Sequence, residues 1–240
     1  MTDISSTASI SADPRLIVAL DQPSIQEAEQ LIDRLGDSVS FYKIGLQLLP
    51  IGGMDLCARL KAAGKHVFLD YKLHDIPATV EKATISICGA GADLLTVHAE
   101  PAVMRAAAAG RGDSDLKILG VTVMTCYDDA MLEEMGYGMK ARDLVFRRVE
   151  QSLEAGIDGV VASAQEAAEI REKFGEGFLI VTPGIRPAGA DAGDQKRIAT
   201  PANALADGAT HLVVGRPIHA AGNPAAAAAA IAAEMASQGR

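Results

Sequence analysis

The chain has 240 residues, of which 49% are hydrophobic and 22% charged, so it can bury a sizeable core and is not disordered as a whole. Its formal net charge of −9 argues against a nucleic-acid or membrane-surface partner recognised through bulk positive charge. An anionic small molecule would need only a local basic site.

The three cysteines form no Cys-x-x-Cys pair, which suits a reducing compartment. The polar start of the chain lacks the basic and apolar regions of a signal peptide. No apolar run approaches the roughly 18 residues that span a bilayer. We therefore expect a cytoplasmic protein with a flexible N-terminal segment, residues 1–13.

Short β-rich runs alternate with segments of helical pattern along the rest of the chain. The expected strands are LIVALD (16–21), SFYKIGL (40–46), VFLDYK (67–72), LLTVHA (94–99), KILGVTVMT (117–125), GVVAS (159–163), FLIVTPG (178–184) and HLVVG (211–215). The expected helices cover 24–35, about 53–63, a segment from Pro77, 101–109, segments between 129 and 155, about 165–174, and the Ala-rich tail from Pro224. Ser24 and Glu27 have the spacing of a capping box.

Eight strand–helix units in one chain of this length predict a single-domain α/β protein, a (β/α)8 TIM barrel over residues 14–240. Continuous apolar strands indicate burial on both faces, as in parallel sheets. A doubly wound open sheet is the alternative, which the absence of Gly-x-Gly-x-x-Gly after the first strand weakens. No shift in composition marks a second domain.

Polar side chains collect where the expected strands end, the edge at which barrel enzymes carry their active sites. The residues at these ends are Asp21, Lys43, Asp70, Lys72, His98, Thr125, Ser163, Pro183, Gly184, Gly215 and Arg216, and all but the proline and the two glycines have polar side chains. Any one of them could be polar only because strand ends meet water. Asp and Lys recur, however, where Ser, Asn or Gly would serve a plain turn.

The stretch FLDYKLHDIP places Asp70 and Lys72 two residues apart, so their side chains share one face of the strand. Lys43 and Asp21 approach from neighbouring strands, and Asp75 lies just beyond. Unit charges about 4 Å apart interact by about 4 kcal/mol at an effective dielectric near 20. The array is either a salt-bridge network that closes the barrel mouth or a site in which Lys72, kept charged by carboxylates, donates a proton.

A second group follows the last two strands, in VTPGIRP and VVGRP. Gly184 and Gly215 would let backbone N–H groups approach an anion, and Arg186 and Arg216 offer forked donors suited to phosphate. Barrels commonly bind phosphate with these two loops. The alternative is two glycine turns with surface arginines. The five histidines show no His-x-His or His-Glu-x-x-His spacing, so we expect no metal site.

FLDYKLHDIPATV closely resembles the signature of the orotidine 5′-phosphate decarboxylase family, with its Asp-x-Lys-x-x-Asp-Ile-Pro core. LIVALD, YKIGLQLL, VTPGIRP with the downstream GDQ, and VVGRPI resemble that family's other blocks, in the same order. The resemblance runs from about Arg15 to the last helix. One departure is Ala78, where relatives often have Asn.

The resemblance implies a dimeric barrel that converts orotidine 5′-phosphate to uridine 5′-phosphate, the last step of de novo pyrimidine nucleotide synthesis, without metal or organic cofactor. It implies that Lys72 protonates C6 of the pyrimidine, that Asp70 lies beside the substrate carboxylate, and that Asp75, with Thr79, reaches into the partner subunit's site. The other implied substrate contacts are Asp21, Lys43, Ile76, Thr125, Pro183, Arg186, Gln195, Gly215 and Arg216.

Two rivals stay open. One is a Mg²⁺-dependent sugar-phosphate decarboxylase or aldolase on a related barrel, which would need carboxylates open to a metal. Lys43 and Lys72 among the carboxylates disfavour a bound cation. The other is a phosphate-ligand sensor without turnover.

Overall fold

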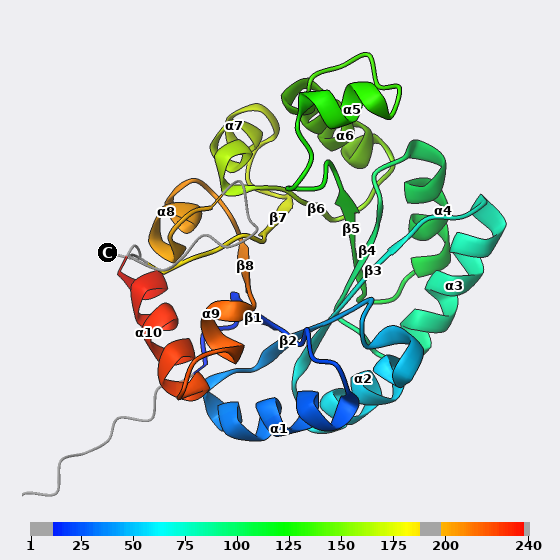
Figure 1. Ribbon diagram of the computed structural model, residues 1–240. Helices are drawn as coiled ribbons and strands as arrows, with labels where there is room; N and C mark the ends of the chain where they lie inside the picture. Colours follow the sequence, from blue (N-terminus) through cyan, green and yellow to red (C-terminus); the bar gives the residue numbers. More distant parts are fainter. Residues whose placement is uncertain (1–11, 188–197, 238–240) are drawn as a thin grey trace, which may run out of the picture.

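The computed structural model describes residues 12–187 and 198–237, and within them eight parallel strands close into one barrel in chain order. Helices surround the barrel as an outer ring (Figure 1). The closed barrel confirms the predicted (β/α)8 fold and excludes the open doubly wound sheet. Most of the predicted N-terminal segment lies outside the described residues. Within the described ranges, no helix is both long and apolar enough to cross a membrane.

The elements follow the predicted order. The strands are β1 Leu16–Ala19, β2 Phe41–Gly45, β3 His66–Leu73, β4 Leu94–His98, β5 Lys117–Val121, β6 Gly159–Val161, β7 Leu179–Thr182 and β8 His211–Val214. The helices are α1 Ile25–Leu35, α2 Gly53–Ala62, α3 Pro77–Gly89, α4 Pro101–Arg111, α5 Asp129–Glu134, α6 Ala141–Glu154, α7 Ala164–Phe174, α8 Pro201–Ala206, α9 Arg216–His219 and α10 Pro224–Ala236, with short 3₁₀ turns η1 Gly36–Ser38 and η2 Leu49–Ile51. Ser24 caps α1 as expected, accepting a hydrogen bond from the Glu27 N–H at 3.2 Å.

Alternation along the strands divides the core into two parts. Side chains that point inward fill the barrel with an apolar plug: Ile17, Ala19, Phe41, Phe68, Leu94, Leu119, Val181 and Val213. Side chains that point outward pack under the helices, as Leu69 and Tyr71 of β3 do. Because both faces are buried, the strands are continuously apolar rather than alternating. This plug lies beneath the side chains at the barrel mouth and packs against them from below.

The structure corrects two expectations about element boundaries. β1 ends at Ala19, so Asp21 follows the strand by two residues, whereas Lys43 and Asp70 lie inside β2 and β3. Lys72 is the last residue but one of β3, as expected. The segment before β8 also contains α8, which is not among the expected helices. Thr200 caps α8 by accepting from the Asn203 N–H, and a proline follows it at the first helical position.

One device recurs at the opposite, N-terminal end of the barrel. Before β4, β6 and β8, a glycine with positive φ is followed by an apolar residue and then by Asp93, Asp158 or Thr210. Each of these three side chains accepts a hydrogen bond from a backbone N–H of the preceding strand: Asp93 from Val67 (2.7 Å), Asp158 from Ile118 (2.9 Å) and Thr210 from Ile180 (3.1 Å). We call this arrangement the base clasp.

Candidate active site

Four charged side chains meet at the mouth of the barrel, above the apolar plug. Asp70 lies at the centre: its Oδ1 is 2.8 Å from the Lys72 Nζ, and its Oδ2 is 3.4 Å from the Lys43 Nζ. The Lys43 Nζ is in turn 3.3 Å from the Asp21 Oδ1. The order Asp21–Lys43–Asp70–Lys72 therefore alternates in sign, as the sequence predicted.

The strands themselves place these groups. Asp70 and Lys72 alternate with Tyr71, which points outward and donates a hydrogen bond to the Met54 sulfur. Parallel pairing sets Gly45 of β2 beside Asp70. A Cβ on Gly45 would lie only 3.0 Å from the Lys43 Nζ, so glycine leaves room for this ammonium group to reach Asp21.

Asp70 is held in its ionised form. Burial in the barrel mouth by itself would raise the pKa of Asp70, but the charges of Lys43 and Lys72, with hydrogen bonds from Lys72 and Thr96, outweigh it and keep that pKa below its usual range. The carboxylate therefore remains charged at neutral pH, and each of its oxygens faces an ammonium group. The array carries two negative and two positive charges.

Two adjoining cavities open above the array. The inner one, of about 180 Å³, is bounded by Asp70, Lys72 and Thr125 together with apolar side chains. The outer one, of about 490 Å³, is lined by Ala19, Asp21, Lys43, Asp70, Pro183, Gly184, Arg186, Val213, Gly215, Arg216 and His219. Lys43, Asp70, Pro183 and Val213 line both, so the two form one continuous site.

The outer cavity is where the predicted anion-binding residues meet. Gly184 has φ +78°, a conformation that side-chain-bearing residues rarely adopt. Arg186 is 8% exposed and donates to the Ile185 carbonyl at 2.8 Å. Arg216 begins α9 directly after Gly215. Two guanidinium groups and two glycine turns thus face one space, which favours the anion site over unrelated surface turns.

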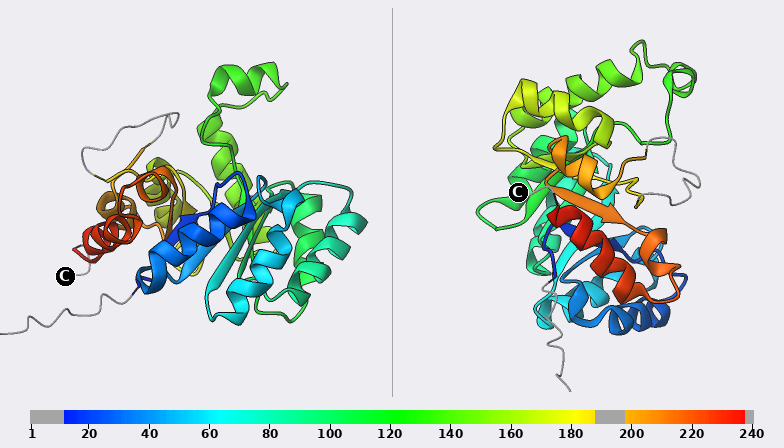
Figure 2. Two further views of the ribbon diagram at one scale, coloured as in Figure 1. Left: turned by 60° about the horizontal axis from the view of Figure 1, so that its bottom comes forward. Right: turned by 90° about the vertical axis from the view of Figure 1, so that its left-hand side faces the viewer.

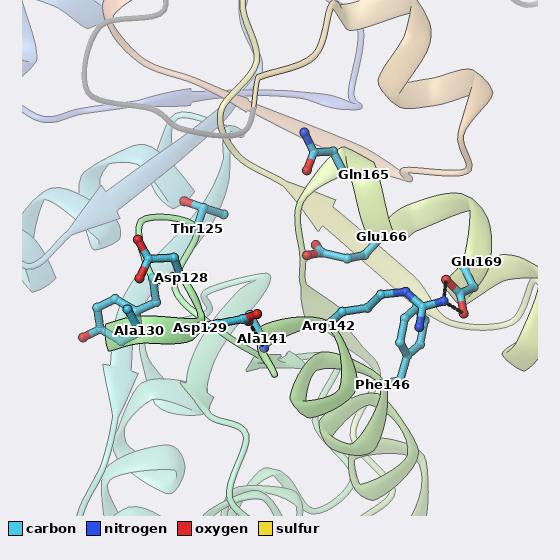
Figure 3. A pocket seen from close by; sticks show the side chains of 11 residues that line it. Thr125, Asp128, Asp129, Ala130, Ala141, Arg142, Phe146, Gln165, Glu166 and Glu169 are labelled. Carbon is cyan, nitrogen blue, oxygen red and sulfur yellow. Dashed lines mark hydrogen bonds and ion pairs between the residues drawn. The ribbon is translucent and has the colours of Figure 1, made fainter. Parts of the chain in front are cut away.

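A third hollow, of about 680 Å³, lies beside the mouth between α5, α6 and α7 (Figure 3). α5 and its flanking chain stand away from the barrel in both views of Figure 2. Among the described residues that line this hollow are four carboxylates and one guanidinium, that of Arg142, which is bonded to Glu169 at 2.6 Å. Thr125 lies at its edge. This acidic lining disfavours an anionic substrate.

Three predicted residues do not join the array within one chain. Asp75, Ile76 and Thr79 are exposed, Ile76 by 66%, and the described linings of both mouth cavities leave them out. The Asp75 carboxylate accepts from the neighbouring Ile76 N–H at 2.6 Å. Gln195 lies outside the described residues.

Sequence reasoning missed three residues of the site. Thr96 on β4 is fully buried and donates to the Asp70 Oδ1 at 3.0 Å. Gly45 makes room for Lys43, and His219 lines the outer cavity. Burial lowers the pKa of His219; Arg216 lowers it further, and Asp21 opposes this, so its ring is neutral at neutral pH. Gly45 stands in the quoted block YKIGLQLL, but no spacing singled it out, and Thr96 and His219 lie outside the quoted blocks.

The donor set does not suit a metal ion. Each carboxylate of the array already has an ammonium group within 3.4 Å. A divalent cation bound there would meet two positive charges at close range, which costs free energy rather than releasing it. The arrangement suits instead a reaction in which negative charge develops next to Lys72.

Comparison with known proteins finds a matching family profile and similar proteins. The profile described as "Orotidine 5'-phosphate decarboxylase / HUMPS family" matches residues 14–231. An orotidine 5′-phosphate decarboxylase of Caulobacter sp. (strain K31) is 59% identical over 227 residues, covering 95% of this chain and 99% of the relative. One of Methylorubrum extorquens (strain PA1) is 58% identical over 227 residues, covering 94% and 97%.

A solved structure agrees with the fold. The crystal structure of orotidine 5′-phosphate decarboxylase from Lactobacillus acidophilus superposes with a TM-score of 0.82 at 35% identity, covering 93% of this chain and 99% of that one. The motifs quoted from the sequence, the barrel and the family profile all coincide over nearly the whole chain. The chain therefore belongs to the orotidine 5′-phosphate decarboxylase / HUMPS family.

Proposed function

We propose that this protein decarboxylates orotidine 5′-phosphate to uridine 5′-phosphate, a step of pyrimidine nucleotide synthesis, with its own side chains as the only catalysts. The observation that carries the proposal is the Lys72 ammonium group, held 2.8 Å from Asp70 at the wall of the inner cavity. A relative that carries this name is 59% identical to the chain over 227 residues.

The proposed chemistry is a replacement of CO₂ by a proton at C6. The bond between C6 and the carboxylate carbon breaks, its electron pair stays on C6, and Lys72 transfers a proton to that carbon as neutral CO₂ leaves. An ammonium group next to C6 stabilises negative charge that exists only near the transition state, so its effect falls on the rate rather than on substrate binding. Solvent then restores the proton of Lys72.

The inner cavity suits the base and the departing CO₂. Apolar side chains of Phe68, Val121 and Val161 line it beside Asp70 and Lys72. Such a wall accommodates an apolar CO₂ molecule better than a carboxylate, and Asp70 adds like-charge repulsion against the bound carboxylate. We assign the Thr125 hydroxyl, at the wall of the same cavity, to a hydrogen bond with the pyrimidine edge.

The outer cavity suits the phosphate. Arg186, Arg216 and the glycine turns of Gly184 and Gly215 line it, next to Asp21 and Lys43, which we assign to the ribose hydroxyls. We expect Pro183, which lines both cavities, to contact the nucleotide between its two ends, and Gln195 to bind phosphate. Binding energy gained at this remote group can be used to hold the base against Lys72.

We further infer that two chains build each site. Asp75, Ile76 and Thr79 are exposed in the single chain, and exposed apolar side chains occur on the same β/α unit and its neighbour, among them Leu46, Ile51 and Ile85. A partner covering this region would bury that apolar surface. It would also carry its own Asp75 toward the array of the first chain.

We infer too that residues 14–240 form the decarboxylase unit, to which the family match over 14–231 lends support. The three cysteines are free, consistent with the proposed cytoplasmic location.

The test is turnover of orotidine 5′-phosphate, followed by ultraviolet absorbance after exhaustive chelation. Wild type should turn over fully, which would dispose of a Mg²⁺-dependent reaction. Lys72→Ala should lose at least about 10⁴-fold in kcat, because it removes both the proton donor and the charge next to C6. Absence of wild-type turnover with retained ligand binding would favour the sensor and overturn the proposal.

Lys61→Ala is the matched control. Lys61 is also a partly buried lysine bonded to a carboxylate, Asp93, at 2.7 Å, but it lies at the opposite end of the barrel. Its loss should leave kcat within about twofold. An equal loss in both variants would show that any broken lysine–aspartate pair disables the enzyme.

The two-chain site has its own test. Lys72→Ala and Asp75→Ala chains, each inactive alone, should regain part of the activity when mixed, because a mixed dimer contains one site with both wild-type residues. Chain exchange is verified by mass spectrometry of differently tagged chains. Verified exchange without recovery would contradict a shared site.

A further inference from the structure

The segment that carries Asp70 and Lys72 departs from regular strand geometry. β3 and β4 pair in register at Leu69 and Leu95, and the next pair joins Leu73 to Val97. Four residues of β3 therefore span the length of two residues of β4, which leaves a bulge around Asp70–Lys72. Bulges of this kind re-aim side chains, and they are common next to active sites.

Lys72 has an unusual backbone conformation within this bulge. Its φ is +49°, and it is the one residue other than glycine with positive φ in ranges 12–187 and 198–237. A left-handed conformation is unfavourable for a side-chain-bearing residue, because its Cβ comes too close to the following carbonyl oxygen. It persists only where surrounding contacts hold it in place.

Thr96 supplies those contacts. It lies on β4 opposite the bulge and is fully buried. Its Oγ1 accepts a hydrogen bond from the Lys72 backbone N–H at 3.0 Å, which replaces the strand bond that the bulge interrupts. The same hydroxyl donates to the Asp70 Oδ1 at 3.0 Å, the oxygen that also binds the Lys72 Nζ. One hydroxyl thus ties the Lys72 backbone to the carboxylate that orients its side chain.

From this geometry we propose that Thr96 is a positioning residue for the decarboxylation: its hydroxyl fixes the strained Lys72 backbone and the Asp70 carboxylate together, so that the ammonium group points at the reacting carbon. This inference rests on the proposed function. Thr96 touches neither cavity in the described linings, so it acts through Lys72 and Asp70 rather than on the substrate. Removing the hydroxyl leaves a buried N–H and one carboxylate bond unmade.

The decisive variant is Thr96→Val, which keeps the shape and the strand preference of the side chain but removes the hydroxyl. We expect kcat to fall by roughly 10- to 100-fold, since small misplacements of reacting groups cost up to about 10²-fold, while KM changes by less than about threefold. Thr96→Ser restores the hydroxyl and should keep kcat within about threefold of wild type. Full kcat in Thr96→Val, or an equal loss in Thr96→Ser, overturns the proposal.

Thr84→Val is the matched control for lost packing or stability. Thr84 is another fully buried threonine, and its hydroxyl donates to the Val80 carbonyl at 2.9 Å on the outer helix α3. It should leave kcat within about twofold. A comparable loss of kcat in Thr84→Val would mean that any deleted buried hydroxyl slows the enzyme, and the specific role of Thr96 would be rejected.

A crystal structure of Thr96→Val separates this inference from the proposed function. We expect the φ of Lys72 to leave the left-handed region and its Nζ to separate from the Asp70 Oδ1. This readout needs no turnover, so it decides the role of Thr96 even if wild type fails to act on orotidine 5′-phosphate. An unchanged Lys72 in that structure overturns the proposal whatever the kinetics.

Discussion

The two ends of the barrel both carry networks of paired charges, but the partners of the carboxylates differ. At the N-terminal end, Asp93 and Asp158 each bind a backbone N–H in addition to basic side chains. At the mouth, the partners of Asp70 among residues 12–187 and 198–237 are all side chains, those of Lys43, Lys72 and Thr96. Paired charge at a strand end is therefore not by itself a sign of function.

The backbone conformation also differs between the two ends. The base clasp supplies hydrogen bonds between neighbouring strands, whereas the array at the mouth lies on a bulge with one residue in a left-handed conformation. Strain of this kind collects at functional sites, where it orients reacting groups. The difference predicts that mutations at the mouth reduce activity more than stability, and that mutations at the base do the reverse.

After Lys72→Ala, the largest effect is expected for Asp70→Asn. The amide keeps the shape of the side chain but leaves Lys43 and Lys72 as two cations without the charge between them. We expect kcat/KM for orotidine 5′-phosphate to fall by about 10³-fold or more, measured by the absorbance assay. A loss below tenfold would show that Asp70 contributes geometry alone.

Arg216→Ala should come next. Loss of one guanidinium from the outer cavity should lower kcat/KM by about 10²-fold, equivalent to about 2.7 kcal/mol, through weaker phosphate binding. The phosphate-free nucleoside orotidine should react equally poorly with wild type and variant. If Arg216→Ala also lowered kcat/KM on orotidine by about 10²-fold, Arg216 would not act through the phosphate. By contrast, Thr125→Ser, which keeps its hydroxyl, should change kcat/KM on orotidine 5′-phosphate by less than tenfold.

Asp93→Ala tests the other end. It leaves the Val67 N–H without its side-chain partner, so the free energy of unfolding should fall by about 1–3 kcal/mol, measured by urea denaturation. Its kcat should stay within about twofold of wild type. Were activity lost while stability held, the contrast between the two ends would be wrong.

The smallest effect is expected for the pH dependence of the stability that Asp93 contributes through the base clasp. Burial would raise the pKa of Asp93, but bonds from Lys61, His66 and the Val67 N–H outweigh it and lower that pKa below its unfolded value of about 3.9. The ionised clasp therefore stabilises the fold above the unfolded pKa, and this contribution disappears as the pH falls through the folded pKa. The stability gap between wild type and Asp93→Asn should be full at pH 7 and shrink below about pH 4. A constant gap would mean that charge at Asp93 is irrelevant.

Much of the site could be predicted because it obeys simple periodicity. Asp70 and Lys72 share a strand face, and parallel neighbours bring Lys43 beside them, so the array followed from spacing and fold class. The contribution of Thr96 could not, because a threonine inside a strand is ordinary and only the bulge gives its hydroxyl two partners. Gly45 was missed because this position needs a residue without a Cβ only when the Lys43 side chain, on the same strand, extends past it.

The sequence was less informative about residues proposed to act in a second chain and about the exact ends of helices and strands. The proposed roles of Asp75 and Thr79 involve a second copy of the chain, so spacing along one sequence cannot place these residues relative to the array. α8 follows a Gly/Asp-rich stretch, which hid the Thr200–Pro201 start signal. Asp21 was assigned to β1 because LIVALD is apolar up to that residue, yet the strand pairs only as far as Ala19.

The base clasp joins strands in twos, β3 with β4, β5 with β6, and β7 with β8. Six of the eight strands are thus joined in sequential pairs by hydrogen bonds between residues 26 to 40 positions apart in the chain, and local contacts favour rapid folding. New termini cut into the connection between α4 and β5 would leave every fastening intact, whereas a break just before Asp93 would sever one. Circular permutation should accordingly be tolerated better at the β2–β3, β4–β5 and β6–β7 connections than at the β3–β4, β5–β6 and β7–β8 connections.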